Sequence, residues 1–385
     1  MQKLMRKLKE FFQKGDLLLL LLCLVTSVYG IVIIASATNY MGSGGYVLRQ
    51  LLALLLGIVC YIAFTLLDVD IFAERWHLLF LFNVLFLLLL VPFGIEGTTG
   101  NRSWISFPFL PFNIQPAELC KIPFIIILAK TMQTNQRKLS APRSILQLGF
   151  QVAFIVLLIL VLSKDAGVAL VYVFIFLVVA FVGGVKLRWF LAGFAAAGAA
   201  APLAWKYLMR DDQKNRIAMV FDPTIDPEGT SVRWHTKQSM LSLNNGGLTG
   251  QGLFHGARTQ AGSLANDHTD FIFSAIGEEL GMLGALFTLL LLTAIIIRCV
   301  YVGLKTKNYM NRLICIGIAA MLVFQVAINV GMCVGSFPVI GLTLPFISYG
   351  GSSLVTMYLA MGVVSGIHMR PQPDSENRYI SPRYE

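Results

Sequence analysis

"LLLLLLCLVTSVYGIVIIASA", at Leu17–Ala37, is the first long apolar run of the chain, and it is long enough to cross a bilayer. It follows a basic segment, as the apolar region of a secretory signal would. However, the run is too long for a signal peptide, and no small-residue cleavage site is evident after it. We therefore interpret it as a retained membrane span.

Runs of the same kind recur along the whole chain. Of its 385 residues, 56% are hydrophobic and only 13% are charged, whereas about a quarter of the residues in a soluble domain are charged. The sequence therefore predicts an all-α polytopic membrane protein with ten transmembrane helices. We place these helices at residues 17–37, 47–67, 77–93, 115–132, 145–163, 166–184, 188–207, 281–303, 313–334 and 346–367.

The predicted spans divide the chain into three regions. Residues 1–16 form a basic cytoplasmic N-terminal segment, residues 17–367 form the membrane domain, and residues 368–385 form a cytoplasmic C-terminal tail. The membrane domain includes a large outer loop at residues 208–270, between the seventh and eighth spans. This loop carries six Lys or Arg against seven Asp or Glu, which favours a folded cap with short interfacial helices; a flexible linker is the alternative.

The net charge of +10 reflects the topology and does not indicate a nucleic-acid partner. With the N-terminus inside, the basic residues collect in alternate loops and in the tails, whereas the short loops on the other side hold little beyond Arg102 and Lys164. This is the positive-inside bias of membrane proteins, and it predicts that both termini are cytoplasmic. The six cysteines lie in or beside the spans without metal-ligating spacing, so we expect no disulfide framework.

Polar residues at membrane depth mark two further features. Glu118 and Lys121 are three residues apart, so they share one helical face and can pair. A charge at the bilayer centre costs about 2.5–3.5 kcal/mol, and the pair could serve either helix packing or substrate contact. The stretch "GLTLPFISYGGSS", at residues 341–353, combines Pro345 with paired glycines. It predicts irregular backbone that either lines a cavity or packs closely on a neighbour.

The stretch "LANDHTDFIFSAIGEELG", at residues 264–281, places acidic residues directly before the eighth span. Asp270 would lie at the outer interface, wet on one side and apolar on the other. Such a setting raises the proton affinity of a carboxylate toward the value that a general base needs. The alternatives stay open: Asp267 could cap a helix, His268 could be structural, and Glu278 and Glu279 could cap the span or bind partner arginines.

Six motifs, in order along the chain, resemble those of the SEDS family (shape, elongation, division and sporulation), whose members include RodA, FtsW and SpoVE. They are "NRSWI" at residues 101–105, "QPAEL" followed by Lys121, "KDAGVALV" from Lys164, "KQSMLSLNNGGLTGQG" from Lys237, "HTDFIFSAIGEELG" from His268 and "LPFISYGGSS" from Leu344. The resemblance covers nearly the whole chain between its tails. The "ARTQ" at Ala257–Gln260 is closer to the RodA members than to the FtsW members.

The resemblance implies a peptidoglycan glycosyltransferase with a core similar to that of GT-C-type lipid-linked sugar transferases. Such proteins polymerise lipid II on the outer face of the bacterial cytoplasmic membrane, by an inverting reaction that forms β-1,4 bonds and releases undecaprenyl pyrophosphate. They work with a class B penicillin-binding protein. The likeness to RodA implies a role in cell elongation and shape.

The family motifs also imply site residues. Asp270, the aspartate of "HTDFIF", is the expected catalytic residue. The leaving pyrophosphate requires positive charge or a divalent cation such as Mg²⁺ or Mn²⁺, although no dedicated metal site is legible. The expected substrate-binding residues are Arg102, Trp104, Glu118, Lys121, Arg216, Arg233, Gln238, Ser239, His268, Thr269, Ser348 and Ser352.

Two departures from the family pattern limit what can be transferred. The family usually has Leu-Pro-Glu shortly before His-Thr-Asp, whereas this chain has "LAND" at residues 264–267, and Lys164 stands where the family usually has proline before Asp165.

Two other functional classes remain as alternatives. One is a flippase for the lipid-linked precursor, although the densest polar cluster lies at the outer surface instead of the midplane. The other is a non-catalytic scaffold that activates its synthase partner.

Overall fold

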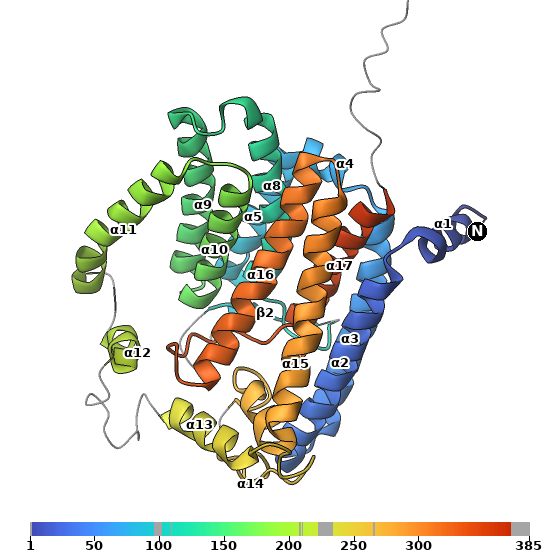
Figure 1. Ribbon diagram of the computed structural model, residues 1–385, viewed down its shortest axis with the longest axis vertical. Helices are drawn as coiled ribbons and strands as arrows, with labels where there is room; N and C mark the ends of the chain where they lie inside the picture. Colours follow the sequence, from blue (N-terminus) through green and yellow to red (C-terminus); the bar gives the residue numbers. More distant parts are fainter. Residues whose placement is uncertain are drawn as a thin grey trace, which may run out of the picture.

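The computed structural model describes residues 2–95, 102–108, 110–207, 209, 211–221, 234–264 and 266–370. Regular structure within them is helical except for a small antiparallel sheet, in which Gly94 pairs with Ile105 and Ile95 with Trp104. Figure 1 shows the long helices side by side in one bundle. Helix α1 projects from the bundle near one end, called here the α1 end, and α13 and α14 lie at the opposite end, called the α14 end.

The elements, in chain order, are α1 (Gln2–Lys14), α2 (Leu17–Ala37), η1 (Asn39–Met41), α3 (Gly44–Leu66), α4 (Val69–Glu74), α5 (Trp76–Leu88), α6 (Leu90–Phe93), β1 (Gly94–Ile95), β2 (Trp104–Ile105), α7 (Pro116–Leu119), α8 (Lys121–Thr134), η2 (Gln136–Lys138), α9 (Pro142–Leu162), α10 (Ala166–Val182), α11 (Leu187–Tyr207), α12 (Asp211–Phe221), α13 (Trp234–Gly246), α14 (Ala257–Gln260), α15 (Ile272–Lys305), α16 (Tyr309–Cys333) and α17 (Gly351–Met369).

The all-α polytopic fold predicted from the sequence is confirmed. By length and composition, eight helices in the described residues can span a membrane, namely α2, α3, α5 with α6, α9, α11, α15, α16 and α17. The apolar helix α10 has 17 residues and α8 has 14. The count of ten spans therefore stays a prediction, as do the three chain regions. The expected outer loop, at residues 208–270, contains α12, α13 and α14.

Two helices do not begin where the eighth and tenth spans were predicted to begin, at residues 281 and 346. Helix α15 begins at Ile272, and Gly281 lies inside it with a φ of +65°. A Cβ on Gly281 would lie 2.4 Å from the backbone nitrogen of Gly250, so only glycine lets the segment after α13 approach the helix at this kink. Helix α17 begins at Gly351 because residues 341–350 are irregular.

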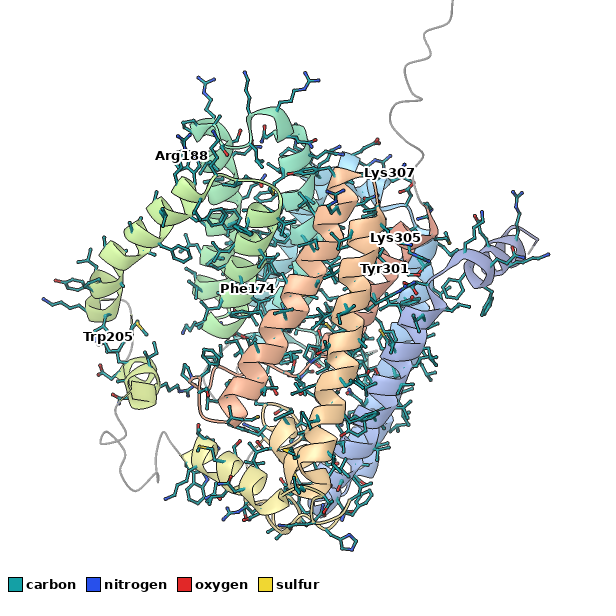
Figure 2. The ribbon with its side chains drawn as sticks, in the orientation of Figure 1. Phe174, Arg188, Trp205, Tyr301, Lys305 and Lys307 are labelled. Carbon is teal, nitrogen blue, oxygen red and sulfur yellow. The ribbon has the colours of Figure 1, made fainter. Side chains whose placement is uncertain are left out.

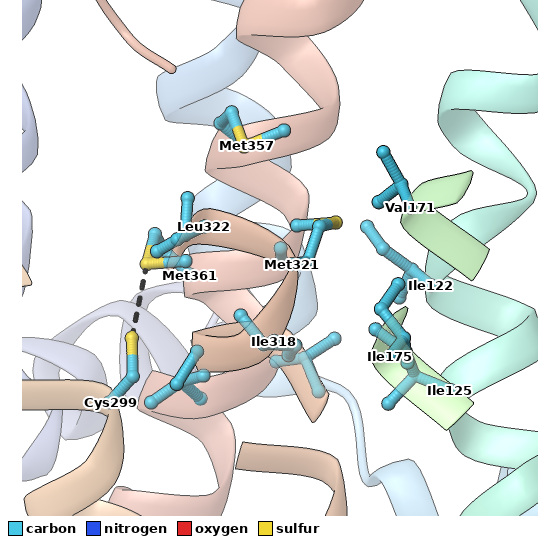
Figure 3. Close-up of a cluster of buried hydrophobic side chains, with 14 of the residues drawn as sticks. Ile122, Ile125, Val171, Ile175, Cys299, Ile318, Met321, Leu322, Met357 and Met361 are labelled. Carbon is cyan, nitrogen blue, oxygen red and sulfur yellow. Dashed lines mark hydrogen bonds between the residues drawn. The ribbon is translucent and has the colours of Figure 1, made fainter. Parts of the chain in front are cut away.

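The core of the bundle lies where α8, α10, α16 and α17 meet. Figure 3 shows Ile122 of α8 and Met321 of α16 in one cluster of apolar side chains from these helices. Met361 of α17 extends the cluster toward α15 by accepting a hydrogen bond from the Cys299 thiol at 3.6 Å. Because lipid is as apolar as these side chains, close packing holds such helices together more than transfer from water does.

A buried ion pair ties the α1 end of the bundle together. Arg298 of α15 binds the Asp16 carboxylate through Nε at 2.8 Å and Nη2 at 3.0 Å, a bidentate geometry that strengthens the interaction. Asp16 also caps α2 by accepting the Leu19 N–H at 3.1 Å. The backbone of Asp16 donates to the Ser365 hydroxyl and accepts from the Tyr61 hydroxyl. Helices α2, α3, α15 and α17 therefore meet at Asp16.

Hydrogen bonds to two adjacent carboxylates hold the α14 end together. Glu278 is fully buried and accepts the N–H groups of Arg258 and Thr259, each at 2.9 Å, and the Thr259 hydroxyl at 2.7 Å. Glu279 accepts the Ser36 hydroxyl of α2 at 2.6 Å. The sequence left open whether these acids cap the span or bind partner arginines. The structure shows that they bind groups of this same chain, and so fasten α14 and α2 to α15.

Removing the cation of the Asp16–Arg298 pair should destabilise the fold. Arg298→Met leaves the Asp16 carboxylate buried without its ion partner, and breaking a buried pair in this way costs about 3–5 kcal/mol. We expect a lower melting temperature for the purified protein in detergent. Lys305→Met is the matched control, because Lys305 lies in the same helix with its ammonium over the Tyr301 ring, a contact worth about 0.5–1 kcal/mol. Equal melting temperatures for the two variants would contradict this role of the pair.

Glu278→Gln should loosen the α14 segment without unfolding the bundle. A glutamine turns an N–H₂ group toward donors that the carboxylate accepts, and an unsatisfied buried polar group costs about 1–3 kcal/mol. We expect faster hydrogen exchange at residues 256–264, measured by mass spectrometry. Glu74→Gln removes the same charge from an exposed position on α4 and should leave that exchange unchanged. Unaltered exchange in Glu278→Gln would show that the carboxylate does not hold the segment.

Candidate active site

Asp270 lies at the start of α15, and its backbone is held from another helix. Asn329 of α16 donates one hydrogen bond to the Asp270 carbonyl at 2.9 Å and a second to the Leu342 carbonyl at 2.7 Å. Asn329 is fully buried, so both bonds form away from water. The Asp270 side chain is only half-buried. The backbone is thus fixed, while the side chain is not fully enclosed.

The two residues before Asp270 are held by the irregular segment at residues 341–350. The Thr269 carbonyl accepts the Ser348 hydroxyl at 2.6 Å, and the His268 carbonyl accepts the Tyr349 N–H at 2.8 Å. The Ser348 oxygen also accepts the Leu344 N–H at 2.8 Å. The irregular backbone predicted here is therefore present, and it packs against the residues that precede α15, where several of its polar groups find partners.

The shape of this segment depends on unusual backbone angles. Gly341 has a φ of +70° and Phe346 a φ of +65°, and Pro345 precedes Phe346 without offering an N–H. A Cβ built on Gly341 would lie 3.8 Å from Asp270 Oδ2, so Gly341 borders the carboxylate. The segment thus fixes the Asp270 backbone and borders its side chain.

Asp165, at the start of α10, acts electrostatically on Asp270. The Asp165 carboxylate accepts the Val168 N–H at 3.0 Å and the Gln115 side-chain amide at 3.0 Å. The pKa of Asp270 is raised to about 6, chiefly by burial and secondarily by the negative charge of Asp165, while His268 acts in the opposite direction. A carboxyl with a pKa near the working pH is suited to general-base catalysis.

Glu118 and Lys121 form the ion pair predicted from their spacing. Lys121 Nζ lies 2.5 Å from Glu118 Oε1, and both side chains are buried. Burial raises the pKa of Asp165, and the charge of Glu118 raises it further, whereas Lys121 lowers it. The pair therefore lies close enough to Asp165, and through it to Asp270, to belong to one polar site. Its contact with a substrate stays a prediction.

His268 lies in an aromatic cluster beside Asp270. Its ring makes an edge contact with Tyr46 at 5.3 Å and a tilted contact with Tyr349 at 5.7 Å between centroids. His268 Nδ1 lies 3.1 Å from Asp267 Oδ1. Burial raises the pKa of Asp267, and His268 partly offsets this shift. Asp267 thus orients His268, a role that its position in "LAND" did not reveal.

Part of the predicted substrate set lies around this centre. Ser352 accepts the Gln115 N–H at 3.1 Å. Because the Gln115 side chain also binds Asp165, Ser352 lies near Asp165 at the entry to α7. Arg216 donates to the Val339 carbonyl at 3.2 Å, next to the irregular segment. Burial lowers the pKa of His235, and Arg216 lowers it further, so α12 and α13 approach each other here.

Of the other predicted substrate residues, Gln238 and Ser239 make contacts of their own, with residues other than Asp270 and Asp165. Gln238 of α13 accepts a hydrogen bond from Arg258. Ser239 is fully buried and hydrogen-bonds to Ser274 at 2.5 Å and to the Cys333 carbonyl at 2.7 Å. These bonds join α13 to α15 and α16, which is a structural role. Arg102, before β2, is exposed, and Trp104, in β2, is half-buried. Arg233 lies outside the described residues.

Sequence reasoning missed Asn329 and Gln115 as site residues. Both are uncharged amides, and the motifs above give no role to Asn329. Its position four residues from Gln325, on one face of α16, was the available signal. Nothing in the spacing indicated that its partners are the carbonyls of Asp270 and Leu342, because those residues lie about 60 and 13 positions away.

The described residues contain no group of three His, Cys, Asp or Glu side chains placed to hold a metal ion. A divalent cation therefore stays a prediction, and an ion at this site would need ligands from the substrate as well. Mg²⁺ commonly binds in this way, through one or two carboxylates and substrate phosphates.

Comparison with known proteins agrees with the geometry. The profile of a family described as "Cell cycle protein" and comprising FtsW, RodA and SpoVE matches residues 16–372. The peptidoglycan glycosyltransferase MrdB of Escherichia coli K12 is 30% identical over 366 residues, covering 94% of this chain and 95% of the relative. Stage V sporulation protein E of Bacillus subtilis is 32% identical over 368 residues, covering 91% and 96%.

Solved structures show the same fold. One, described as "Structural coordination of polymerization and crosslinking by a peptidoglycan synthase complex", matches with a TM-score of 0.77 and 30% identity, covering 95% of this chain and 99% of the other. The Rod shape determining protein RodA of Thermus thermophilus matches with a TM-score of 0.67 and 27% identity, covering 94% and 98%. This chain is a multi-pass membrane protein, and it belongs to the FtsW/RodA/SpoVE (SEDS) family of cell cycle proteins.

Proposed function

We propose that this protein is a peptidoglycan glycosyltransferase that polymerises lipid II, with Asp270 as its general base. The observation that carries the proposal is the state of Asp270, whose backbone is fixed, whose side chain is half-buried and whose pKa is raised to about 6. The Escherichia coli relative MrdB, which is named a peptidoglycan glycosyltransferase, supports the reaction class.

The reaction is a displacement at the anomeric carbon of the donor. Asp270 takes the proton of the acceptor GlcNAc 4-hydroxyl, and the oxygen attacks C1 of the donor MurNAc from the face opposite the leaving group. The C1–O bond to the pyrophosphate breaks with inversion, and the electron pair leaves on undecaprenyl pyrophosphate. Developing charge on that group needs nearby cations, for which Lys121 and Arg216 are candidates within the described residues.

The basic residues support a topology with the site on the outer face of the cytoplasmic membrane and both termini in the cytoplasm. Figure 2 shows Arg188, Lys305 and Lys307 toward the α1 end, away from α13 and α14. This distribution is what the positive-inside bias requires if the α14 end is external. A class B penicillin-binding protein is the proposed partner, because the solved complex in the comparison joins polymerisation to crosslinking, and cell elongation is the proposed role.

Asp270→Asn should abolish polymerisation of labelled lipid II by the purified protein in the presence of its partner. The amide keeps the size of the side chain but cannot accept the hydroxyl proton, and loss of a general base reduces a rate by about 10²–10⁴-fold. Glycan strands are measured on gels, with any glycosyltransferase activity of the partner excluded.

Asp211→Asn is the matched control, because Asp211 lies in the same outer region with its side chain 94% exposed. It should retain full activity. Normal strands from folded Asp270→Asn protein would overturn the catalytic assignment, and no strands from folded, partner-bound wild type would favour a flippase or a scaffold.

The pH dependence should report the coupling of Asp270 to Asp165. With a pKa of about 6, Asp270 becomes protonated as the pH falls below 6, and the rate should fall with it. Asp165→Asn removes a negative charge that raises the Asp270 pKa, so the acid limb of the rate profile should shift to lower pH, toward the ordinary aspartate value of about 3.9 without reaching it, since burial remains. Asp211→Asn should leave the profile in place. An unshifted limb in Asp165→Asn would contradict the coupling.

A further inference from the structure

The N-terminal helix α1 has a sharply segregated sequence. At 100° per residue, the apolar positions fall within one arc of about 120°, and every Lys, Arg, Glu and Gln falls outside it. Five Lys or Arg stand against one Glu in its 13 residues. A short helix with one apolar face and one basic face is typical of segments that lie in the plane of a membrane surface. The apolar positions are Leu4, Met5, Leu8, Phe11 and Phe12.

The direction in which α1 leaves the bundle is fixed by its last turn. Phe11 is fully buried, and its ring makes an edge contact with Tyr61 of α3 at 6.2 Å. The Phe11 carbonyl accepts the Gly15 N–H at 2.8 Å, and the next residue, Asp16, is held by Arg298. These contacts hold the junction at the point where α1 projects from the side of the bundle (Figure 1).

The apolar face of α1 continues the lipid-facing surface of α2. Phe12 is 63% exposed, and Leu17, Leu18 and Leu21 on the first turns of α2 are exposed as well. In a spanning helix such exposed leucines face lipid. Phe12 comes shortly before these leucines along the chain, so the lipid that they face also reaches α1.

The basic face of α1 is open at the same end of the bundle as other cations. Arg6 and Lys9 are exposed, and Glu10 lies 3.8 Å from Lys14, so the single acid of the helix is already near a cation. Figure 2 shows Lys305 and Lys307 toward this end. An anionic surface is the complement of this charge, and cations beside such a surface are attracted to it within about a Debye length.

We propose that α1 is a docking helix for anionic lipid headgroups. Its apolar face lies at the boundary of the acyl chains, and Arg6, Lys9 and the neighbouring cations bind headgroup phosphates of the leaflet at the α1 end. Because α1 joins Asp16, the docked helix braces the junction of α2, α3, α15 and α17. The inference rests on membrane insertion of the bundle and is independent of the proposed glycosyl transfer.

The test uses the full-length protein in nanodiscs of phosphatidylcholine alone or mixed with phosphatidylglycerol. Hydrogen exchange of residues 2–14 is followed by mass spectrometry. Each cation near an anionic surface contributes about fivefold to binding, so the exchange should be markedly slower in the anionic discs. The double variant Arg6→Gln with Lys9→Gln should weaken the affinity of α1 for the anionic surface by about 25-fold and restore most of the exchange. Glutamine has a helix propensity similar to that of the residues it replaces, so the helix itself should be kept.

The matched control removes the same charge from η2, which lies between α8 and α9. Arg137→Gln with Lys138→Gln changes two exposed cations and should leave the exchange of α1 slow in anionic discs. Equal exchange of wild-type α1 in the two kinds of disc would overturn the proposal without any variant. Slow exchange that survives Arg6→Gln with Lys9→Gln would also overturn it, as would protection that depends on adding another protein.

Discussion

The site depends on the fixation of three successive carbonyl groups, those of His268, Thr269 and Asp270. Buried backbone groups need partners, and here the partners come from the Tyr349 N–H, the Ser348 hydroxyl and the Asn329 amide. Each bond joins the start of α15 to a segment far along the chain. The Asp270 side chain therefore projects from a backbone that is held in place on three successive carbonyls.

The carboxylates of the bundle differ in how completely the fold satisfies them. Asp16 has an arginine and a helix N-terminus, Glu278 has two amides and a hydroxyl, and Glu118 has Lys121. These groups stabilise the structure because each buried carboxylate has an ionic or hydrogen-bonding partner. Within the described residues, the Asp270 carboxylate is given no hydrogen bond, and its pKa is raised to about 6. A group in that state is suited to take up a proton.

The two ends of the bundle use polar groups for different purposes. At the α1 end, the Asp16–Arg298 pair locks helix ends together and fixes the exit of a basic helix. At the α14 end, Glu278 and Glu279 fasten α14 and α2 to α15, near the kink at Gly281. Both arrangements bring charges close to an apolar span, where they are tolerated because each has its partner. The stretch at residues 264–281 therefore contains two acids, Glu278 and Glu279, that fasten the fold, and the predicted catalytic acid, Asp270.

The sequence by itself determined the class of fold and the family, and it predicted Asp270 as the key acid. Apolar runs of spanning length leave helices as the main option in a membrane, and the order of six motifs marked the family. The i, i+3 spacing of Glu118 and Lys121 predicted their pair, since such a contact is local. Tertiary structure alone decided which distant groups meet: Asn329 with Asp270, Arg298 with Asp16, and Asp165 with Asp270. No periodicity encodes those contacts, because they depend on how helices separated by up to about 280 residues pack together, and the pKa of Asp270 follows from that packing.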